Sequence, residues 1–345
     1  SLEALGHVLG RPVRRASDFL ADFPLAGHID LMTTTSFEHP QDVWNLQGEM
    51  PRGLASIALS APVGASGRWQ LRGGATQGEL TSWMIAGSYS VRPDDSGHAY
   101  EAGMSFAAQR YADPTSTGSD LLNRRSAGEL YASDTWTLGT RARVSYGGRY
   151  ARYDYLSQSG LFSPRIEASV TPLPGHQLRV TGTISRRYRA PGAEEFQDGA
   201  HGIWLPAGRS FSALSASTGF VAERVDRMGV SAEQPLIAGI VAEAAVFHQG
   251  VANQLSTVFG TTSERAGRGS RHYLVTPTGD ADVHGWSAVL VRRTAAGLQA
   301  EVSYSDASAH WSPAVVPVRA LLSAFGPSAL HAPAEHIRNV TASSE

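Results

Sequence analysis

The segment from Pro191 to Phe211 concentrates side chains that could bind a ligand. These are two adjacent carboxylates, an imidazole, an indole and a guanidinium, from Glu194, Glu195, His201, Trp204 and Arg209. Carboxylate and imidazole groups can hold a hard metal ion or a metal chelate, and an indole ring can stack on a sugar. A structural alternative stays open, in which both glutamates pair with arginines of neighbouring strands and Trp204 packs the loop.

No other group of residues has the spacing of a catalytic centre. The 12 histidines are scattered, without a His-Glu-x-x-His or a Gly-x-Ser-x-Gly pattern, and the chain has no cysteine. The sequence therefore predicts no catalytic residues, no metal held by the protein and no cofactor, and we do not expect an enzyme. With 17% charged residues and a formal net charge of -2, the chain also lacks the clustered positive charge of a nucleic-acid surface.

Two segments of alternating polarity lead into this loop. In the first, Ile166 and Val170 alternate with Arg165 and Glu167, and residues 178–189 repeat the pattern. Because successive side chains of a strand point to opposite faces, each segment predicts a strand with one apolar and one polar face. The second segment is long enough to cross a bilayer as a tilted strand, which needs roughly 9–11 residues.

The same alternation returns along the chain, in residues 68–76, 100–109, 141–150 and 298–305. We therefore predict an all-β protein, an antiparallel transmembrane β-barrel segment of about 12–13 meandering strands in an incomplete barrel. Long and short connections alternate, which is typical of outer-membrane barrels. No run of about 18 apolar residues is present, which excludes a helical membrane span.

The arginines of the polar faces are predicted to face the lumen of this barrel. They are Arg165, Arg179, Arg187 and Arg189. An arginine on the lipid side costs about 2–4 kcal/mol at the bilayer midplane. Two roles stay open for them, attraction of an anionic substrate or pairing with acidic residues across the sheet. Near the end of one strand, an aromatic girdle at the membrane interface is predicted from Tyr146, Tyr150, Tyr153 and Tyr155.

The motif Ser163-Pro164-Arg165, with Arg189-Ala190-Pro191 and the Glu194-Glu195 pair after it, resembles the barrel of TonB-dependent outer-membrane receptors. In that family a strand opening with Ser-Pro-Arg is followed, one hairpin later, by an aromatic-Arg-Ala-Pro segment and an acidic pair. Residues 281–286 are similar to the family's segment that re-enters the barrel, and residues 27–34 resemble the last strand of its plug domain. The resemblance covers about residues 54–311.

The resemblance implies three parts of the chain. Residues 1–45 would be the tail of a plug domain with its linker, residues 46–311 the strands and loops of the barrel, and residues 312–345 an irregular loop or truncated end. The chain would then be the middle of a longer receptor, with the plug mostly absent. An isolated copy would not close into a transporting barrel.

The function implied by the resemblance is active uptake of a scarce substrate across the bacterial outer membrane. Family analogy suggests a ferric siderophore, a cobalamin or an oligosaccharide as substrate. The partners would be the lipid bilayer, the substrate and the TonB energy-coupling complex, the last through the missing N-terminal part. Two alternatives stay open: a passive or structural outer-membrane barrel such as a porin or an adhesin, and a soluble β-sandwich or propeller.

Overall fold

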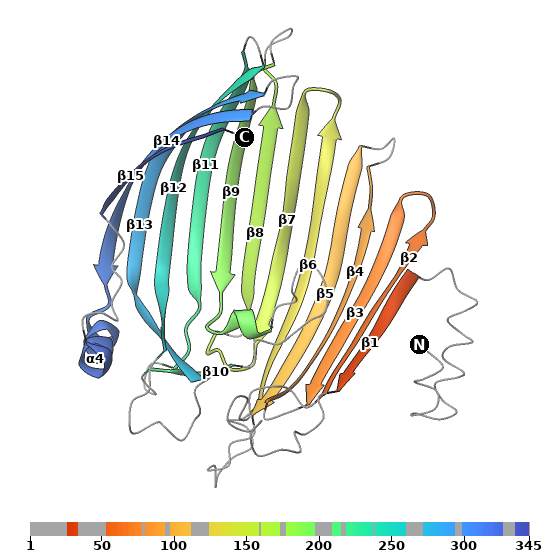
Figure 1. Ribbon diagram of the computed structural model, residues 1–345, viewed down its shortest axis with the longest axis vertical. Helices are drawn as coiled ribbons and strands as arrows, with labels where there is room; N and C mark the ends of the chain where they lie inside the picture. Colours follow the sequence, from red (N-terminus) through yellow and green to blue (C-terminus); the bar gives the residue numbers. More distant parts are fainter. Residues whose placement is uncertain are drawn as a thin grey trace.

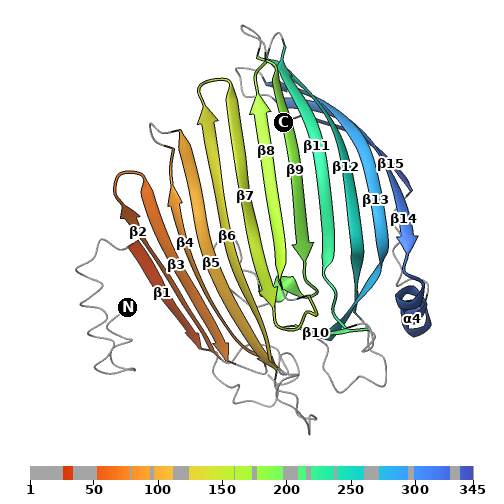
Figure 2. The same ribbon diagram turned by 180° about the vertical axis from the view of Figure 1, so that it is seen from behind.

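A computed structural model of the chain shows one large, open and almost entirely antiparallel sheet (Figures 1 and 2). It describes residues 26–33, 53–77, 80–93, 97–111, 124–158, 160–172, 177–196, 209–214, 219–236, 239–259, 272–293, 299–326 and 335–344. The strands are β1 (Ala26–Thr33), β2 (Gly53–Val63), β3 (Gly67–Gln77), β4 (Leu80–Val91), β5 (His98–Tyr111), β6 (Arg124–Leu138), β7 (Ala142–Tyr153), β8 (Leu161–Val170), β9 (Arg179–Arg189), β10 (Ser210–Ala213), β11 (Glu223–Pro235), β12 (Ile240–Phe259), β13 (His272–Arg293), β14 (Gln299–Pro313) and β15 (His336–Ser344). The helical elements are η2 (Ala193–Glu195) and α4 (Val315–Phe325).

Neighbours in the sheet follow the order of the chain, from β1 to β9 and from β11 to β15. Every pair along this path is antiparallel, whereas β10 lies off the path and pairs in parallel with the start of β13. The predicted meander is therefore confirmed. The two edge strands, β1 and β15, do not pair with each other, so the sheet of the described residues is not closed.

The two faces of the sheet differ in the way that the alternation predicts. One face carries large apolar side chains in contact with solvent, such as Ile166, Ile184, Val246 and Val302. The opposite face carries most of the charged side chains of the strands, including an ion pair of 2.7 Å between Arg165 and Glu167. Transfer of the exposed apolar side chains of the first face from water to an apolar environment would be favourable by roughly 25 cal/mol for each Å².

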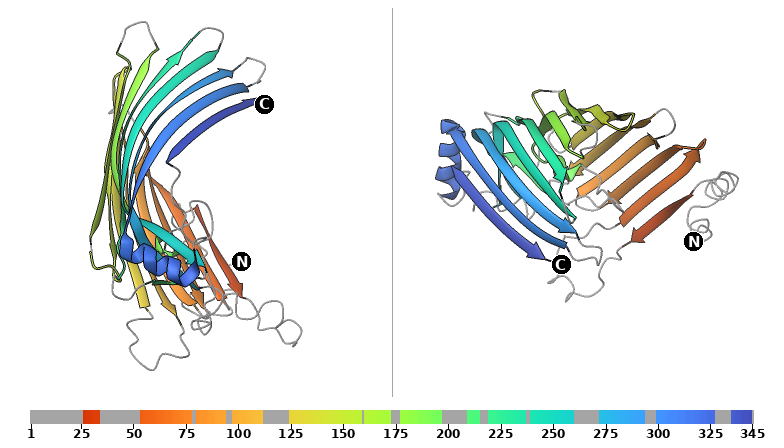
Figure 3. Two further views of the ribbon diagram at one scale, coloured as in Figure 1. Left: turned by 90° about the vertical axis from the view of Figure 1, so that its left-hand side faces the viewer. Right: turned by 90° about the horizontal axis from the view of Figure 1, so that it is seen from above.

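The polar face is the concave one. Figure 3 shows the sheet bent into an open trough, and the segment after β9 packs inside it. This segment contacts the polar face directly, because the Gln109 side chain of β5 donates a hydrogen bond to the carbonyl oxygen of Glu195 in η2. The exposed apolar rows therefore lie on the convex face.

The longest connections all lie at one end of the strands. Residues 64–66, 92–97 and 139–141 join strands at the short-turn end, and residues 112–123, 190–222 and 260–271 join them at the long-loop end. The segment of residues 190–222 is partly structured, because it contains η2 and β10. Its strand β10 places Phe211 beside Tyr273 of β13.

A bulge between β12 and β13 lies next to the start of β13, which pairs with this segment. The register shifts between Val251 and Gln254, where Asn253 adopts a left-handed φ of 55° and donates its backbone N–H to Asp280 Oδ1 at 2.8 Å. On the partner strand Gly279 has a φ of 144°, and a Cβ there would lie 2.2 Å from the Ser312 carbonyl oxygen. Only glycine fits this position, because a side chain would meet backbone.

Two regions of the chain differ from the predicted division into parts. Residues 26–33, expected in the tail of a plug domain, form β1 and pair with β2 in the main sheet. Residues 312–345, expected to be irregular, contain α4 and the edge strand β15. Pro317 is compatible with α4, because a proline within the first turn of a helix removes no intrahelical hydrogen bond. Among the described helices, none has the length and apolar composition to cross a membrane.

A compact hydrophobic cluster fills the trough at the long-loop end. Strand residues such as Ala107, Ala151 and Tyr153 pack in it against Phe196 and Phe211 of the 190–222 segment. Elsewhere on the described strands most side chains are exposed or half-buried. The main buried core therefore lies where the segment after β9 covers the sheet.

Replacing Gly147 by valine should destabilise the sheet. A Cβ at this position would lie 2.6 Å from the Ala132 carbonyl oxygen and 2.8 Å from the Ser133 Cβ, and such overpacking typically costs about 1–3 kcal/mol. Urea unfolding of both proteins measures the loss. Gly182→Val is the matched control, because nothing lies within 4 Å of a Cβ there. An equal loss in both variants would contradict the close approach of β6 to β7.

Candidate functional site

The segment after β9 is held against the concave face by backbone contacts at both ends of η2. The Tyr155 hydroxyl donates a hydrogen bond to the Pro191 carbonyl oxygen at 2.7 Å. At the other end, the buried side chain of Gln109 donates to the Glu195 carbonyl oxygen. These two bonds hold the chain at fixed points before and after the turn that carries Glu194 and Glu195.

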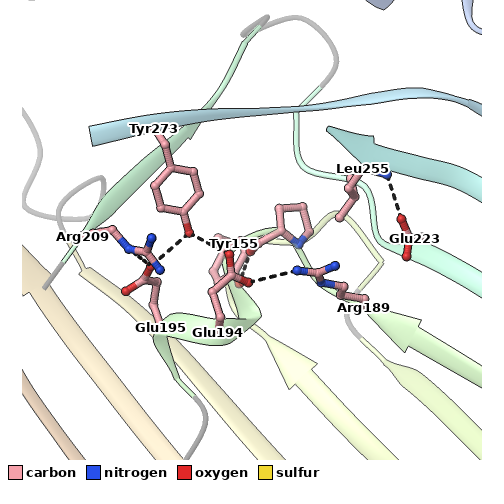
Figure 4. A network of polar contacts seen from close by, with 9 residues as sticks. Tyr155, Arg189, Glu194, Glu195, Arg209, Glu223, Leu255 and Tyr273 are labelled. Atoms are coloured by element: carbon pink, nitrogen blue, oxygen red, sulfur yellow. Dashed lines mark hydrogen bonds and ion pairs between the residues drawn. The ribbon is translucent and has the colours of Figure 1, made fainter. Parts of the chain in front are cut away.

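Glu194, Glu195 and Arg209 lie together around one tyrosine, as Figure 4 shows. The Tyr273 hydroxyl lies 3.3 Å from Glu194 Oε1 and 3.2 Å from Glu195 Oε1. Arg209 Nε lies 3.2 Å from Glu195 Oε1, and Arg189 Nη2 lies 3.9 Å from Glu194 Oε2. The two carboxylates therefore tie β9, β13 and the residue before β10 to one short helical turn.

Glu195 is the most unusual ionisable group of this network. Its side chain is fully buried, and its Oε2 atom has no hydrogen-bond partner among the described residues. Burial raises the pKa of Glu195 above its ordinary value, although the charge of Arg209 and the hydrogen bond from Tyr273 act in the opposite direction. An unpartnered carboxylate oxygen in this environment favours the protonated form.

Aromatic rings surround the network on its inner side. The Tyr155 ring stacks on Phe196 at 6.0 Å and meets Phe211 edge-on at 5.5 Å. Phe211 stacks in turn on Tyr273 at 5.6 Å, and the Arg125 guanidinium lies 4.0 Å from the centroid of the Phe211 ring. Such ring pairs and cation–π contacts stabilise the loop beyond the area that they bury. The 190–222 segment is therefore a fixed part of the trough where the structure describes it.

A pocket of about 340 Å³ lies next to Phe196 on the concave face. Two rows of paired strand residues form its wall. One row runs from β3 to β6 through Arg72, Ala86, Ser105 and Glu129. The adjacent row runs from β3 to β7 through Gln70, Ser88, Gly103, Tyr131 and Arg149. Small residues of β4 and β5 form the floor, and long polar side chains stand on both sides.

Hydrogen-bond donors predominate in this pocket. Arg149 Nη2 donates to the Glu129 carboxylate, whereas Arg149 Nε is buried and has no hydrogen-bond partner among the described residues. The Tyr131 ring crosses the backbone of Gly103, where a Cβ would lie 2.6 Å from the tyrosine oxygen. With the second guanidinium, of Arg72, on the opposite wall, the pocket suits a ligand rich in acceptor oxygens.

The structure brings together three of the five residues that the sequence proposed for a ligand-binding loop. Glu194, Glu195 and Arg209 meet. Glu194 contacts Arg189 of β9, as the structural alternative expects, whereas Glu195 pairs with Arg209 of the loop itself. His201 and Trp204 lie outside the described residues. Within the described ranges, no three histidine, aspartate or glutamate side chains gather closely enough to hold a metal ion.

The four arginines predicted to face a lumen all lie on the concave face, by the register of β8 and β9. Arg165 pairs with Ser185 in the row beside Arg187, and Arg179 and Arg189 follow the same alternation. The four tyrosines of the predicted aromatic girdle do not lie together. Tyr146 and Tyr150 are exposed on the convex face, while Tyr153 and Tyr155 pack with the loop in the trough. Tyr153 belongs to the opposite set of alternating positions, and Tyr155 follows the strand.

Sequence reasoning missed Glu129 and Tyr131 as pocket residues. Both occupy polar positions of an alternating segment. The alternation indicates the face of the sheet on which they lie, but it does not indicate that they line a pocket. Their neighbours Arg72 and Arg149 are 77 positions apart in the chain and reach the pocket through the pairing of five consecutive strands. A strand register is needed to find such a group.

Tyr273→Phe should loosen the 190–222 segment, because two carboxylates lose the hydroxyl that lies between them. A buried polar group left without its partner costs roughly 1–3 kcal/mol. The free energy of unfolding and the rate of proteolysis within this segment both measure the effect. Tyr304→Phe is a suitable control, because its hydroxyl makes only a 3.4 Å contact to Asp306. Similar changes in both variants would argue against the network.

The stability of the folded loop should fall as the pH rises through the raised pKa of Glu195. The folded state binds the Glu195 proton more tightly than the unfolded state, so the bound proton stabilises the folded state. This stabilisation is fully present below the ordinary carboxyl pKa of about 4.3 and is lost above the raised pKa of Glu195. Glu195→Gln should remove this pH dependence, and Glu167→Gln should keep it. Urea midpoints from about pH 4 to about pH 8 test the prediction, and an unchanged profile for Glu195→Gln would contradict it.

Comparisons with known proteins agree with this architecture. The family model described as TonB dependent receptor-like, beta-barrel matches residues 22–326. The siderophore receptor PirA from Pseudomonas aeruginosa has a similar fold, with a TM-score of 0.52 and 17% identity over 76% of this chain and 50% of the receptor. The outer membrane transporter YddB from Escherichia coli gives a TM-score of 0.47 and 12% identity over 75% of this chain and 42% of the transporter.

A search of curated protein sequences found no match. The chain spans half or less of the length of the two solved structures. The family match covers most of the described sheet, from β1 to α4, and the fold is that of a barrel wall. The chain belongs to the TonB-dependent receptor β-barrel family.

Proposed function

We propose that this chain forms part of the barrel wall of an outer-membrane receptor that actively takes up a scarce substrate. Membership of the family supports this class of function, which is transport without an enzymatic step. The observation that carries the proposal for this chain is the donor-rich pocket in the trough, with the buried, unpartnered Nε of Arg149. A buried donor without a partner is costly unless a ligand satisfies it.

The two faces of the sheet support a place in the bacterial outer membrane. The exposed apolar rows of the convex face would contact lipid, while the arginines of the concave face would line a water-filled lumen. The opposite arrangement would place Arg165, Arg179, Arg187 and Arg189 against hydrocarbon, at about 2–4 kcal/mol each at the midplane. The convex face therefore faces the bilayer in this proposal.

The pocket favours a substrate rich in acceptor oxygens. Among the classes of substrate in question, a ferric siderophore, a cobalamin and an oligosaccharide all carry such oxygens. Arg72 and Arg149 on opposite walls suit those that also carry negative charge, because a guanidinium binds a carboxylate or phenolate through charge-assisted hydrogen bonds. Phe196 adds an apolar surface at the rim.

Coupling to TonB would depend on parts of the receptor outside this chain. The energy would come from the inner membrane, so uptake would stop when the gradient there is lost. A porin or an adhesin built on the same wall would not show this dependence. The energy requirement therefore separates the proposed receptor from a passive barrel.

Arg149→Gln in the receptor that contains this chain should lower the affinity for the substrate by about tenfold or more, because a hydrogen bond to a charged group contributes about 1.5–3 kcal/mol. Uptake of labelled substrate by cells, with and without a protonophore, measures both affinity and energy dependence. Arg143→Gln is the control, since Arg143 lies on the same face of β7 but outside the pocket. Uptake that continues with the protonophore would contradict an active receptor, and equal effects of both substitutions would contradict the pocket.

A further inference from the structure

The concave pocket beside Phe196 contains a carboxylate among its donors. Glu129 accepts a hydrogen bond from Arg149 Nη2, and the side chains of Glu129 and Arg149 remain 24% and 29% exposed. A carboxylate has about four lone-pair sites, so Glu129 can accept further hydrogen bonds while it stays paired with Arg149. A ligand that contacts Glu129 therefore needs hydrogen-bond donors of its own.

A donor and an acceptor stand side by side on this wall of the pocket. Glu129 and Arg149 come from the neighbouring strands β6 and β7, and the buried Nε of Arg149 has no hydrogen-bond partner among the described residues. A hydroxyl group is both a donor and an acceptor. Two hydroxyls on adjacent carbons can therefore donate to Glu129 and accept from Arg149 at the same time, and sugar rings carry such hydroxyl pairs.

Tyr131 gives the pocket a flat aromatic surface. Its ring lies across the backbone of Gly103, where a Cβ would lie 2.6 Å from the tyrosine Cζ, and its hydroxyl donates to Glu101 Oε1 at 3.0 Å. One side of the ring covers this glycine, and the ring also lines the pocket, so a ligand can contact its other side. The face of an aromatic ring is negative and attracts the C–H groups of a sugar.

The charged side chains that line the pocket nearly balance. Two arginines and one glutamate give the lining a formal charge of +1, with Arg72 on β3 across the pocket from Arg149. A single carboxylate on the ligand would neutralise this charge. The iron complex of a tris-catecholate carries several negative charges and only acceptor oxygens, so Glu129 would repel it.

We propose that this pocket binds a uronic-acid unit of an acidic oligosaccharide. The sugar ring would lie on the Tyr131 ring, and two adjacent hydroxyls would bind Glu129 and Arg149. The carboxylate would bind Arg72 through charge-assisted hydrogen bonds. The inference rests on the proposed function, because it requires the concave pocket to be the substrate site.

The dimensions of the pocket agree with this ligand. Three strand spacings place the backbones of β3 and β6 about 14 Å apart, which leaves room for a sugar ring between the side chains of Arg72 and Glu129. The volume of about 340 Å³ is small for a substrate site. A sugar chain can place one unit in such a pocket while its other units extend along the trough, whereas a compact chelate or a macrocycle would have to enter whole.

Isothermal titration calorimetry of the receptor that contains this chain tests the proposal. The probes are trigalacturonate and trimannuronate, the methyl ester of each, and the iron complex of a tris-catecholate. We expect at least one of the two acids to bind about tenfold more tightly than its ester, because only the acid offers a charged partner to Arg72. The same acid should bind more tightly than the iron complex.

Substitutions in the pocket assign each part of this preference. Arg72→Gln should remove the difference between acid and ester without lowering the affinity for the ester. Arg143→Gln is the matched control, because Arg143 lies on the same face but outside the pocket. Tyr131→Leu should lower the affinity for acid and ester alike, whereas Tyr131→Phe, which keeps the ring, should preserve it.

Glu129→Gln separates a sugar from a siderophore by the sign of its effect. Loss of this carboxylate should weaken the binding of the acid, because a donor of the sugar loses its charged acceptor. The same substitution should strengthen the binding of the iron complex, because a like charge is removed from the pocket.

The outcomes distinguish the sugar assignment from the function on which it rests. The assignment is overturned if neither acid binds more tightly than its ester, or if the iron complex binds most tightly and weakens in Arg149→Gln. Both results leave an active receptor in place. Conversely, uptake of the preferred acid that continues in the presence of a protonophore would overturn the active receptor but not the preference of the pocket. An equal loss of preference in Arg143→Gln would show that the general charge of the trough, and not the pocket, selects the acid.

Discussion

Lateral hydrogen bonding between neighbouring strands is the interaction on which the rest of this structure depends. The strands of the path from β1 to β15 are joined by backbone hydrogen bonds to the strands beside them, and this pairing sets the register. The register decides which side chains of different strands stand in one row. The concave pocket is lined by two such rows, so it does not exist in any single strand.

The bulge between β12 and β13 is a local departure from this pairing, and it lies beside the residues that hold the 190–222 segment. With Asn253 left-handed and Gly279 at a φ open to glycine, β13 changes partners at this point, because its start stays paired with β12 but no longer with β14. It then pairs with β10 and brings the Tyr273 hydroxyl between two carboxylates. The contacts of Glu194, Glu195 and Phe211 with Tyr273 depend on this pairing.

The trough and the outer surface use the same alternation for different purposes. On the inside, polar rows of β3 to β7 surround small residues and leave donors for a ligand. On the outside, the alternation places exposed apolar side chains such as Ile184 and Val246. Small residues matter on the inside, because large side chains on β4 and β5 would fill the pocket.

The alternation of Ile166 with Arg165 and of Ile184 with Ser185 was enough to predict membrane-crossing strands and their two faces, whereas the receptor family was predicted from the resemblance carried by the Ser163-Pro164-Arg165 motif and the segment after β9. The acidic pair at Glu194 and Glu195 could be recognised as a special site, but its partners could not, since Tyr273 and Arg209 approach it only through the β10–β13 pairing. Residues 27–34 were expected as a strand, but its place at the edge of the main sheet depends on the pairing of β1 with β2, and the strand at residues 336–344 likewise depends on its pairing with β14. Chain periodicity thus determines the face of each residue locally, whereas register, bulge and curvature bring distant residues together and were decided only by the tertiary structure.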